Sequence, residues 1–196
     1  MSKLQQIQQL REMTGSGIMD CKEALKKSEF DIDKAVDYLR EKGKAKAAKR
    51  ASREASEGII YSYIHPGSRV GVMVELNCET DFVARTDDFK NIAKELAMQI
   101  AASDPRWLKK EEVSEEDKQR EKEIIKKQLQ DQGKPEDIID RIIEGKINKF
   151  YSQYCLLEMP YIRDDKKKVK EIITEAIGKI GEKIELSRFA RFEIGK

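Results

Sequence analysis

The spacing of the apolar residues changes along this chain of 196 residues, and that change constrains the fold more than any single motif. Up to Gly43 apolar residues recur at the three- and four-residue spacing of helices, and from Gly58 to Cys78 the period falls to the two residues of a strand. Helical spacing then returns, until the closing segment 183–195 again has the character of a strand. This order predicts an α+β fold, in which a small antiparallel sheet is covered by helices.

Residues 1–43 are predicted to form a module of three short helices. Gly15 ends the first helix, Asp31 is the predicted N-cap of the third, and Gly43 suits the position just beyond its end. Leu4, Ile7 and Leu10 share one face of the first helix, and the residues predicted to face the interior are Leu25, Val36 and Leu39. Helices of this size bury little surface, so the module is expected to be small and marginally stable.

A basic segment, residues 44–57, follows this module and overlaps the stretch REKGKAKAAKRASRE, which is residues 40–54. Its alanines favour a helix, but it has no apolar stripe that would pack against a core. It is therefore predicted to be a solvated helical linker. It marks the boundary with the remaining region, residues 58–196.

The region 58–196 is predicted to contain a small sheet with a helix behind it. GIIYSYIH and RVGVMVELNC flank the residues PGS, which is the pattern of an antiparallel hairpin. The closing segment KIELSRFARFEIG adds a third strand, and its apolar phase slips between Leu186 and Phe189, which predicts a bulge or two contacted faces. Thr86 is the predicted N-cap of the helix after the hairpin. The inner face of that helix is predicted to consist of Phe89, Ile92, Leu96 and Ile100.

The charged remainder of this region is predicted to be helical. An αα-hairpin is expected at about 114–150, turning around Gly133 and with Pro135 in the first turn of its second helix. A further helix is predicted over 164–181, where apolar residues follow the helical period and Gly181 stops the helix.

The charge balance and the cysteines narrow the class of protein. The chain carries 39 basic and 37 acidic residues, so no global positive charge indicates that it wraps nucleic acid. Cys21, Cys78 and Cys155 have no CxxC spacing and are predicted to be reduced thiols. The N-terminus has no apolar signal core, and no apolar run approaches membrane-spanning length. We therefore expect a soluble cytoplasmic protein, with no membrane and no direct nucleic-acid partner.

The sequence shows no set of residues suited to catalysis on a small substrate. The single histidine, His65, precedes Pro66 in a predicted turn, and one histidine with scattered cysteines supplies no zinc ligand set. No P-loop, dinucleotide-binding or nucleophile-elbow motif occurs. We therefore predict that the chain is not an enzyme with catalytic side chains, and that it holds no cofactor or metal of its own.

The segment ELNCETDFVAR, residues 75–85, ends the second predicted strand with an acid and an aromatic residue side by side. Taken alone, this pattern assigns Phe82 to the core and Asp81 to a helix cap. In the same way, Ile18 and Met19 can be assigned to the packing of the N-terminal helices. The residues by themselves leave open whether these side chains serve the interior of this chain or a partner.

Two long segments resemble the hallmarks of elongation factor Ts, the guanine-nucleotide exchange factor for elongation factor Tu. They are LREMTGSGIMDCKEAL (residues 10–25) and ELNCETDFVAR (75–85), and the order continues with DPRW, GKPEDIIDRIIEGKINKF and RFARFEIG. The resemblance implies a ubiquitin-associated-like three-helix module, a linker and a sheet-and-helix dimerisation core. For so short a chain, it also implies a homodimer that serves two molecules of elongation factor Tu.

The resemblance further implies which side chains contact elongation factor Tu. The residues it assigns to this contact are Thr80, Asp81, Phe82, Ile18, Met19 and Lys22. The ring of Phe82 is expected to intrude near the magnesium and phosphate region of the partner's G domain, while the α-helical residues Ile18 and Met19 rest against another helix of that domain. On this interpretation, the chain acts on the GDP and Mg²⁺ that its partner holds.

Two other functions are compatible with the residues. The basic linker would suit an RNA-binding accessory of the ribosome that uses Lys44, Lys46, Lys49 and Arg50. The N-terminal helices would suit a ubiquitin-associated-like module that simply binds a peptide or a protein. Release of fluorescent GDP from elongation factor Tu distinguishes exchange from both.

Overall fold

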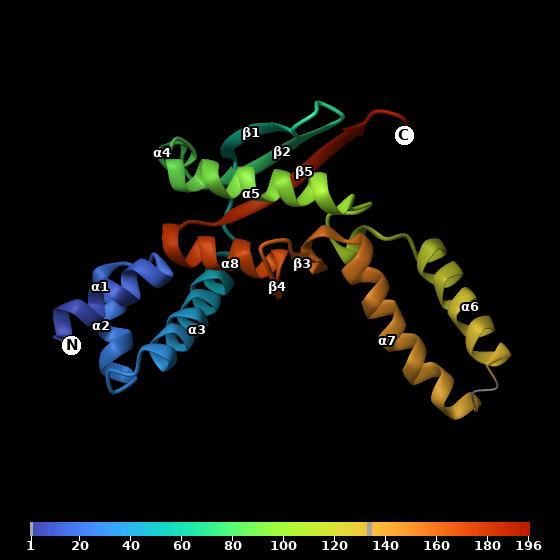
Figure 1. The fold of residues 1–196 in the computed structure, drawn as a ribbon, viewed down its shortest axis with the longest axis horizontal. Helices are drawn as coiled ribbons and strands as arrows, with labels where there is room; N and C mark the ends of the chain where they lie inside the picture. Colours follow the sequence, from blue (N-terminus) through green and yellow to red (C-terminus); the bar gives the residue numbers. More distant parts are fainter. Residues whose placement is uncertain (1, 133–134) are drawn as a thin grey trace. The chain divides into compact units, whose positions relative to one another are not determined.

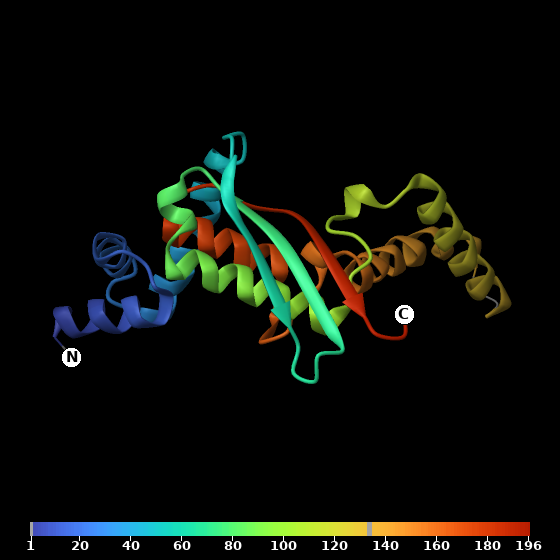
Figure 2. The same ribbon diagram turned by 90° about the horizontal axis from the view of Figure 1, so that it is seen from above.

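The computed structural model describes residues 2–132 and 135–196 (Figures 1 and 2). Its contacts divide the chain into two compact units: unit 1 comprises Met1–Ser62, Val74–Glu95 and Glu171–Ser187, and unit 2 comprises Tyr63–Met73, Leu96–Lys170 and Arg188–Lys196. The α-helices are α1 (Lys3–Thr14), α2 (Ile18–Lys27), α3 (Ile32–Arg50), α4 (Asp81–Ala84), α5 (Asp87–Ser103), α6 (Glu115–Asp131), α7 (Glu136–Tyr154) and α8 (Val169–Ile180). The strands are β1 (Glu57–Ile64), β2 (Val70–Cys78), β3 (Pro160–Tyr161), β4 (Asp164–Lys168) and β5 (Ile184–Glu193), and the short 3-10 helices are η1 (Lys110–Glu112) and η2 (Leu156–Glu158). The fold is α+β, as predicted.

Helices α1, α2 and α3 share a small apolar core within unit 1. It consists of Leu10, Cys21, Ala24, Leu25, Ala35 and Leu39. Two of the predicted helix signals are confirmed: Gly15 ends α1 in the left-handed conformation, and the Asp31 carboxylate accepts a hydrogen bond from the Lys34 amide to cap α3. Of the residues that share one face of α1, Leu10 is fully buried, whereas Leu4 is 67% exposed.

The prediction that Gly43 ends the third helix is also wrong, since α3 continues without a break to Arg50. Gly43 is instead the place where α3 crosses α8: a Cβ atom built on Gly178 would lie 3.0 Å from the Cα atom of Gly43. The absence of side chains at both positions lets the two backbones approach this closely. The division predicted at residues 43/44 and 57/58 stays a prediction, although α3 runs through the first boundary.

The three long strands form one sheet in the order β1-β2-β5. The predicted hairpin is confirmed: β1 and β2 are adjacent, and the His65 amide donates to the Val70 carbonyl across the turn. Along β2, Val72, Val74 and Leu76 are buried, whereas Met73 between them is exposed. This alternation gives the sheet one buried and one open face.

The closing strand β5 changes its buried phase, as predicted. Ile184 and Leu186 are buried, and the partly buried positions that follow are Phe189, Arg191 and Glu193, which are shifted by one residue. Within unit 1, α8 and the first half of α5 lie on one face of the sheet (Figures 1 and 2). Thr86 caps α5 by accepting from the Phe89 amide, and Phe89 is fully buried, so these two predictions are confirmed.

Helices α6 and α7 of unit 2 form the predicted αα-hairpin. Their shared core consists of Ile125, Leu129, Ile139 and Ile147. Ser114 caps α6, and Pro135 occupies the N-cap position immediately before α7. The predicted turn residue Gly133 lies outside the described residues.

The helix predicted over 164–181 begins later than expected. Residues Asp164–Lys168 form strand β4, which pairs with β3 in an antiparallel two-stranded sheet. The reason is visible in the side chains, because this segment reads DDKKK and has no apolar residue to join the helical stripe that starts at the buried Val169. Gly181 stops α8, as predicted, with a φ of 89°.

No helix among residues 2–132 and 135–196 is both long and apolar enough to cross a membrane.

The glycine crossing yields a stability prediction with a matched control. Gly178→Ala adds a methyl group against the Gly43 backbone, and such overpacking costs about 1–3 kcal/mol, which outweighs the roughly 1 kcal/mol by which alanine is the better helix former. Gly145, inside α7, has no atom within 4 Å of a built Cβ, so Gly145→Ala is expected to stabilise by about 0.5–1 kcal/mol. Urea unfolding followed by circular dichroism measures both. Equal stabilisation by the two substitutions would contradict a tight crossing.

Candidate partner-binding surface

The TDF segment forms a single helical turn directly after the central strand. Strand β2 ends at Cys78, and Thr80 is the N-cap of the four-residue helix α4, with its hydroxyl accepting from the Val83 amide at 3.4 Å. On the other side, the Thr86 hydroxyl donates to the Val83 carbonyl at 2.8 Å. A single turn cannot sustain itself in water, because helix nucleation is unfavourable. Its orientation therefore depends on the contacts at its two ends.

Phe82 projects from this turn into solvent. Its side chain is 78% exposed, the highest value among the large apolar side chains of the described residues, whereas Ala84 on the same turn is 5% exposed. The interpretation of Phe82 as a core residue is therefore wrong. Placing Ala84 inward turns the Phe82 side of the helix outward.

Asp81 stands in the first turn of α4 but does not cap it, since that role belongs to Thr80. Its carboxylate accepts from the Arg85 guanidinium at 2.7 Å, four residues further along the chain. Both side chains are well exposed, so this ion pair contributes little stability. Asp81 thus remains accessible next to the aromatic ring.

Two glutamates that sequence reasoning missed hold the base of the turn. Glu182, in the loop between α8 and β5, accepts hydrogen bonds from the Glu79 amide at 3.2 Å, the Thr80 amide at 3.1 Å and the Thr80 hydroxyl at 2.7 Å. In return, Glu79 accepts from the Lys183 amide at 2.6 Å and pairs with Arg53 at 3.0 Å. No local pattern signals this exchange, because the partners are more than a hundred residues apart in the sequence.

The other predicted contact residues lie in the first turns of α2. Ile18 and Met19 are 54% and 74% exposed, and Lys22 is exposed too. The helix buries its opposite face instead, through Cys21, Ala24 and Leu25. Ile18 and Met19 therefore do not form the core of the N-terminal helices.

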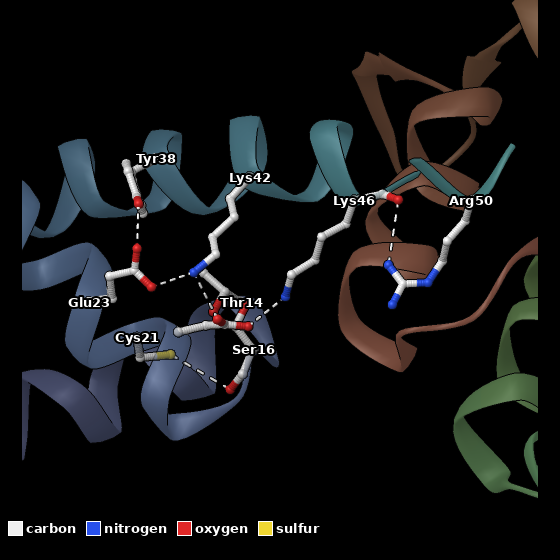
Figure 3. A network of polar contacts seen from close by, with 9 residues as sticks. Thr14, Ser16, Cys21, Glu23, Tyr38, Lys42, Lys46 and Arg50 are labelled. Atoms are coloured by element: carbon white, nitrogen blue, oxygen red, sulfur yellow. Dashed lines mark hydrogen bonds and ion pairs between the residues drawn. The ribbon is translucent and has the colours of Figure 1, made fainter. Parts of the chain in front are cut away.

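A polar network fixes this part of α2 to α3 (Figure 3). Lys42 bridges Asp20 at 3.0 Å and Glu23 at 2.5 Å, and Lys46 adds a second contact to Asp20 at 2.8 Å. The Tyr38 hydroxyl donates to Glu23 at 2.8 Å. The hydrogen bonds from Lys46 and Lys42 hold the pKa of Asp20 below its ordinary value, and the bonds to Glu23 and Asp20 raise the pKa of Lys42. The network keeps the exposed Met19 on a helix with a defined orientation.

The same network uses part of the basic segment that would suit RNA. Lys46 contacts Asp20, Arg53 contacts Glu79, and the Arg50 guanidinium lies 3.5 Å from the Lys46 carbonyl oxygen. Charges that are paired within the chain attract phosphate less strongly. Lys46 and Arg53 are therefore engaged within the chain, whereas Lys44 and Lys49 are exposed. The absence of a nucleic-acid partner stays a prediction.

The side chains considered for catalysis have ordinary structural surroundings. His65 lies exposed beside the hairpin turn, with its Nδ1 atom 3.0 Å from the Tyr63 hydroxyl. All three cysteines are free and buried. Burial raises the pKa of Cys78, next to the negative Glu182, to about 11, and burial raises that of Cys155 to about 11 as well. Such thiols are poor nucleophiles near neutral pH. Within the described residues, no group of three or more candidate ligands is placed to hold a metal ion.

Comparisons with known proteins show the family of this chain. The family model described as "Elongation factor TS" matches residues 3–196. The elongation factor Ts of Caldanaerobacter subterraneus subsp. tengcongensis is 54% identical over 196 residues, which cover 100% of this chain and 98% of that protein. That of Thermotoga neapolitana is 55% identical over 190 residues, covering 97% of this chain and 95% of the relative. The match extends over the hairpin, the exposed turn and the N-terminal helices alike, and the chain belongs to the elongation factor Ts family.

Proposed function

We propose that this chain is a guanine-nucleotide exchange factor, which binds elongation factor Tu in its GDP form and promotes GDP release so that GTP can bind. Membership of the elongation factor Ts family supports exchange on elongation factor Tu. The observation that carries the finer proposal is the exposure of Phe82, which is 78% exposed on a short turn anchored to the rest of unit 1. A large aromatic side chain held in solvent is suited to insertion into another protein.

In this mechanism Phe82 inserts between helices of the partner's G domain, near its magnesium and phosphate site. The intrusion displaces the loop that holds the phosphates and disturbs the Mg²⁺ environment, so GDP is held less tightly. Asp81 adds hydrogen bonds beside the ring, because its carboxylate is accessible and only weakly engaged by Arg85. Thr80 belongs to the same surface and orients it through its hydroxyl.

Binding energy alone is sufficient for such catalysis. The exchange factor must bind the nucleotide-free partner more tightly than the GDP form, and the two ligands weaken each other by the same factor. A ten-thousand-fold effect requires about 5.5 kcal/mol of differential contact. Burial of one phenylalanine supplies roughly 1.5–3 kcal/mol, so Phe82 accounts for part of the effect and other contacts supply the rest.

The first turns of α2 provide a second contact in this proposal. Ile18 and Met19 offer exposed apolar surface, and methionine adapts readily to the shape of a partner. Lys22 lies one turn further and is exposed, so it is available to pair with an acidic side chain. These residues anchor the complex on another helix of the G domain.

We further propose that the chain forms a homodimer, with two copies serving two molecules of elongation factor Tu. The support lies in unit 2, where the face of the sheet opposite its buried side carries exposed apolar side chains. They are Ile64 at 61%, Met73 at 49% and Phe192 at 71%, and Ile194, directly after β5, is 61% exposed. The strands β1 and β5 at the two edges of the sheet carry two of these residues. A second copy would cover this face.

The remaining features of the proposal follow from this activity. The chain acts in the cytoplasm and needs no cofactor of its own, because the GDP and Mg²⁺ belong to the partner. Its N-terminal helices α1–α3 serve as the ubiquitin-associated-like module of the family. The GDP-release assay would fail to respond to this chain if its function were RNA binding through the basic segment.

Phe82→Ala is expected to remove most of the acceleration of GDP release, because the inserted ring is lost. Stopped-flow release of a fluorescent GDP analogue from elongation factor Tu measures this, with the maximal rate falling by at least about tenfold for a loss of roughly 1.5–3 kcal/mol. Leu4→Ala is the matched control, since Leu4 is 67% exposed on α1 and has no assigned contact. Full activity of Phe82→Ala would refute the mechanism. No acceleration by the wild-type chain would refute the function.

Met19→Ala tests the second contact separately. Its expected effect is a rise of about tenfold in the concentration needed for half-maximal acceleration, because one apolar contact is lost, with a smaller change in the maximal rate. Met13→Ala removes a methionine that is 57% exposed on the neighbouring helix α1 and should leave both quantities unchanged. Identical titration curves for the two variants would argue against a contact through α2.

Phe192→Lys tests the homodimer. A charge placed in the exposed sheet face should separate the copies, because a buried unpaired ammonium group is costly. Sedimentation equilibrium is expected to give twice 22.6 kDa for the wild-type chain and 22.6 kDa for the variant. Ile124→Lys, at a side chain 43% exposed on α6, adds the same charge elsewhere and should remain dimeric. A wild-type chain that is monomeric at micromolar concentration contradicts the proposal.

A further inference from the structure

We infer that Glu182 is a positioning residue for nucleotide exchange, which fixes the orientation of the Phe82 turn by binding the backbone just before it. The inference rests on the proposed function, since it assigns a role in presenting Phe82 to elongation factor Tu. Glu182 itself is outside the segments that resemble the family's hallmarks, and it has no assigned role in the contact.

The geometry gives Glu182 direct control over the entry to α4. One carboxylate oxygen accepts from the amides of Glu79 and Thr80, at 3.2 and 3.1 Å, and the other accepts from the Thr80 hydroxyl at 2.7 Å. That hydroxyl is also the cap of α4, because it accepts from the Val83 amide. A single carboxylate therefore fixes both the backbone before the turn and the side chain that begins it.

Glu79 binds the loop that carries Glu182 in the same way as Glu182 binds the segment that carries Glu79. Its carboxylate accepts from the Lys183 amide at 2.6 Å, next to Glu182 in the loop between α8 and β5. The two loops thus exchange carboxylate-to-amide bonds, which are stronger than bonds between neutral groups. With bonds running in both directions, neither loop can rotate without breaking the contact of the other.

The turn has few other means of holding its orientation. Its helix is four residues long, Asp81 pairs with the exposed Arg85, and the capping bond that the Val83 amide donates to the Thr80 hydroxyl is long at 3.4 Å. The buried Ala84 and the bond between Thr86 and Val83 secure the far end of the turn. The near end, from which Phe82 projects, is secured by Glu182 and by the Cys78 thiol, which donates to the Thr80 carbonyl at 3.1 Å.

A positioning role differs in its consequences from a contact with the partner. If Glu182 is replaced, Phe82 remains present but samples many orientations, and insertion into the G domain must then order it. Anchoring through Met19 and Ile18 on α2 is unaffected. The maximal rate of GDP release should therefore fall more than the affinity for the partner.

The first measurement uses the chain alone and does not involve elongation factor Tu. Hydrogen exchange followed by NMR reports the protection of the Glu79 and Thr80 amides in the wild type, Glu182→Ala and Glu182→Gln. In Glu182→Ala both amides lose their acceptor, so their exchange should accelerate by at least about tenfold, which is the effect of losing one hydrogen bond to a charged group. Glu182→Gln keeps one carbonyl oxygen as an acceptor and should show an intermediate rate.

The second measurement is GDP release from elongation factor Tu, titrated with the same variants. Glu182→Ala should lower the maximal rate by about tenfold while the half-saturating concentration changes less, and Glu182→Gln should recover part of the rate. Glu185→Ala is the matched control: it removes the same charge three residues away, where Glu185 pairs with the Lys183 ammonium at 2.8 Å. It should behave as the wild type in both measurements.

The outcomes separate the two levels of the proposal. A wild-type chain that does not accelerate GDP release overturns the proposed function. If the wild type and Glu185→Ala accelerate release and Glu182→Ala does so equally, the positioning role is overturned and the exchange function stands. The positioning role is also overturned if the Glu79 and Thr80 amides are equally protected in Glu182→Ala, or if Glu182→Gln is no better than Glu182→Ala.

Discussion

The crossing of α3 and α8 at two glycines is the contact on which the placement of the N-terminal helices depends. A Cβ atom on Gly178 would lie 3.0 Å from the Gly43 Cα atom, so any larger residue there forces the helices apart. Because α3 continues through this point to Arg50, the helices that carry Ile18 and Met19 are joined to the same compact unit as the Phe82 turn. Both surfaces proposed to bind elongation factor Tu therefore belong to unit 1. A contact made by one of them constrains the other.

The exposed apolar residues share one property: their side chains are not buried within the described part of the chain. Phe82, Met19 and Phe192 are the most exposed large apolar side chains of the described residues, at 78%, 74% and 71%, and each stands on an element whose other face is packed within the chain. Because these side chains are exposed, the folded chain lacks the free energy that their burial would contribute. Binding to a partner that buries them would provide that free energy. Exchange requires only that this free energy be larger with the nucleotide-free partner than with the GDP form. The proposed mechanism therefore requires no acid, base or nucleophile from this chain.

Sequence reasoning succeeded where the signal was local. A helix cap depends on a single residue: the side chains of Asp31 and Thr86 accept the capping hydrogen bonds, and Gly15 has no side chain to oppose the left-handed conformation. The β-hairpin is likewise indicated by the alternation of apolar residues on either side of its turn. Sequence reasoning failed at Gly43, because a glycine that permits a helix crossing looks the same in sequence as a glycine that ends a helix. It failed again at Asp164–Lys168, where the strand depends on pairing with Pro160–Tyr161 and not on its own charged residues.

At the candidate site, too, sequence reasoning could not find a contact between segments that are far apart in the sequence. The resemblance to elongation factor Ts predicted that the segment containing Phe82 contacts the partner. In the structure Phe82 is exposed, which excludes the position in the core that the local pattern alone suggested. Glu182 could not be found in this way, since its role arises only when the loop after α8 meets the end of β2.

The charged residues around the turn differ in the groups they bind and in how much they stabilise it. Arg53 is 54% exposed, so its pair with Glu79 is weak in solvent, as surface ion pairs typically contribute about 0–1 kcal/mol. Glu182 and Glu79 act instead on backbone amides, which cannot move independently of the chain, and charged hydrogen bonds of this kind contribute about 1.5–3 kcal/mol. At the turn itself, the basic segment thus adds one weak ion pair, that of Arg53 with Glu79. The acidic residues define the direction in which the aromatic ring points.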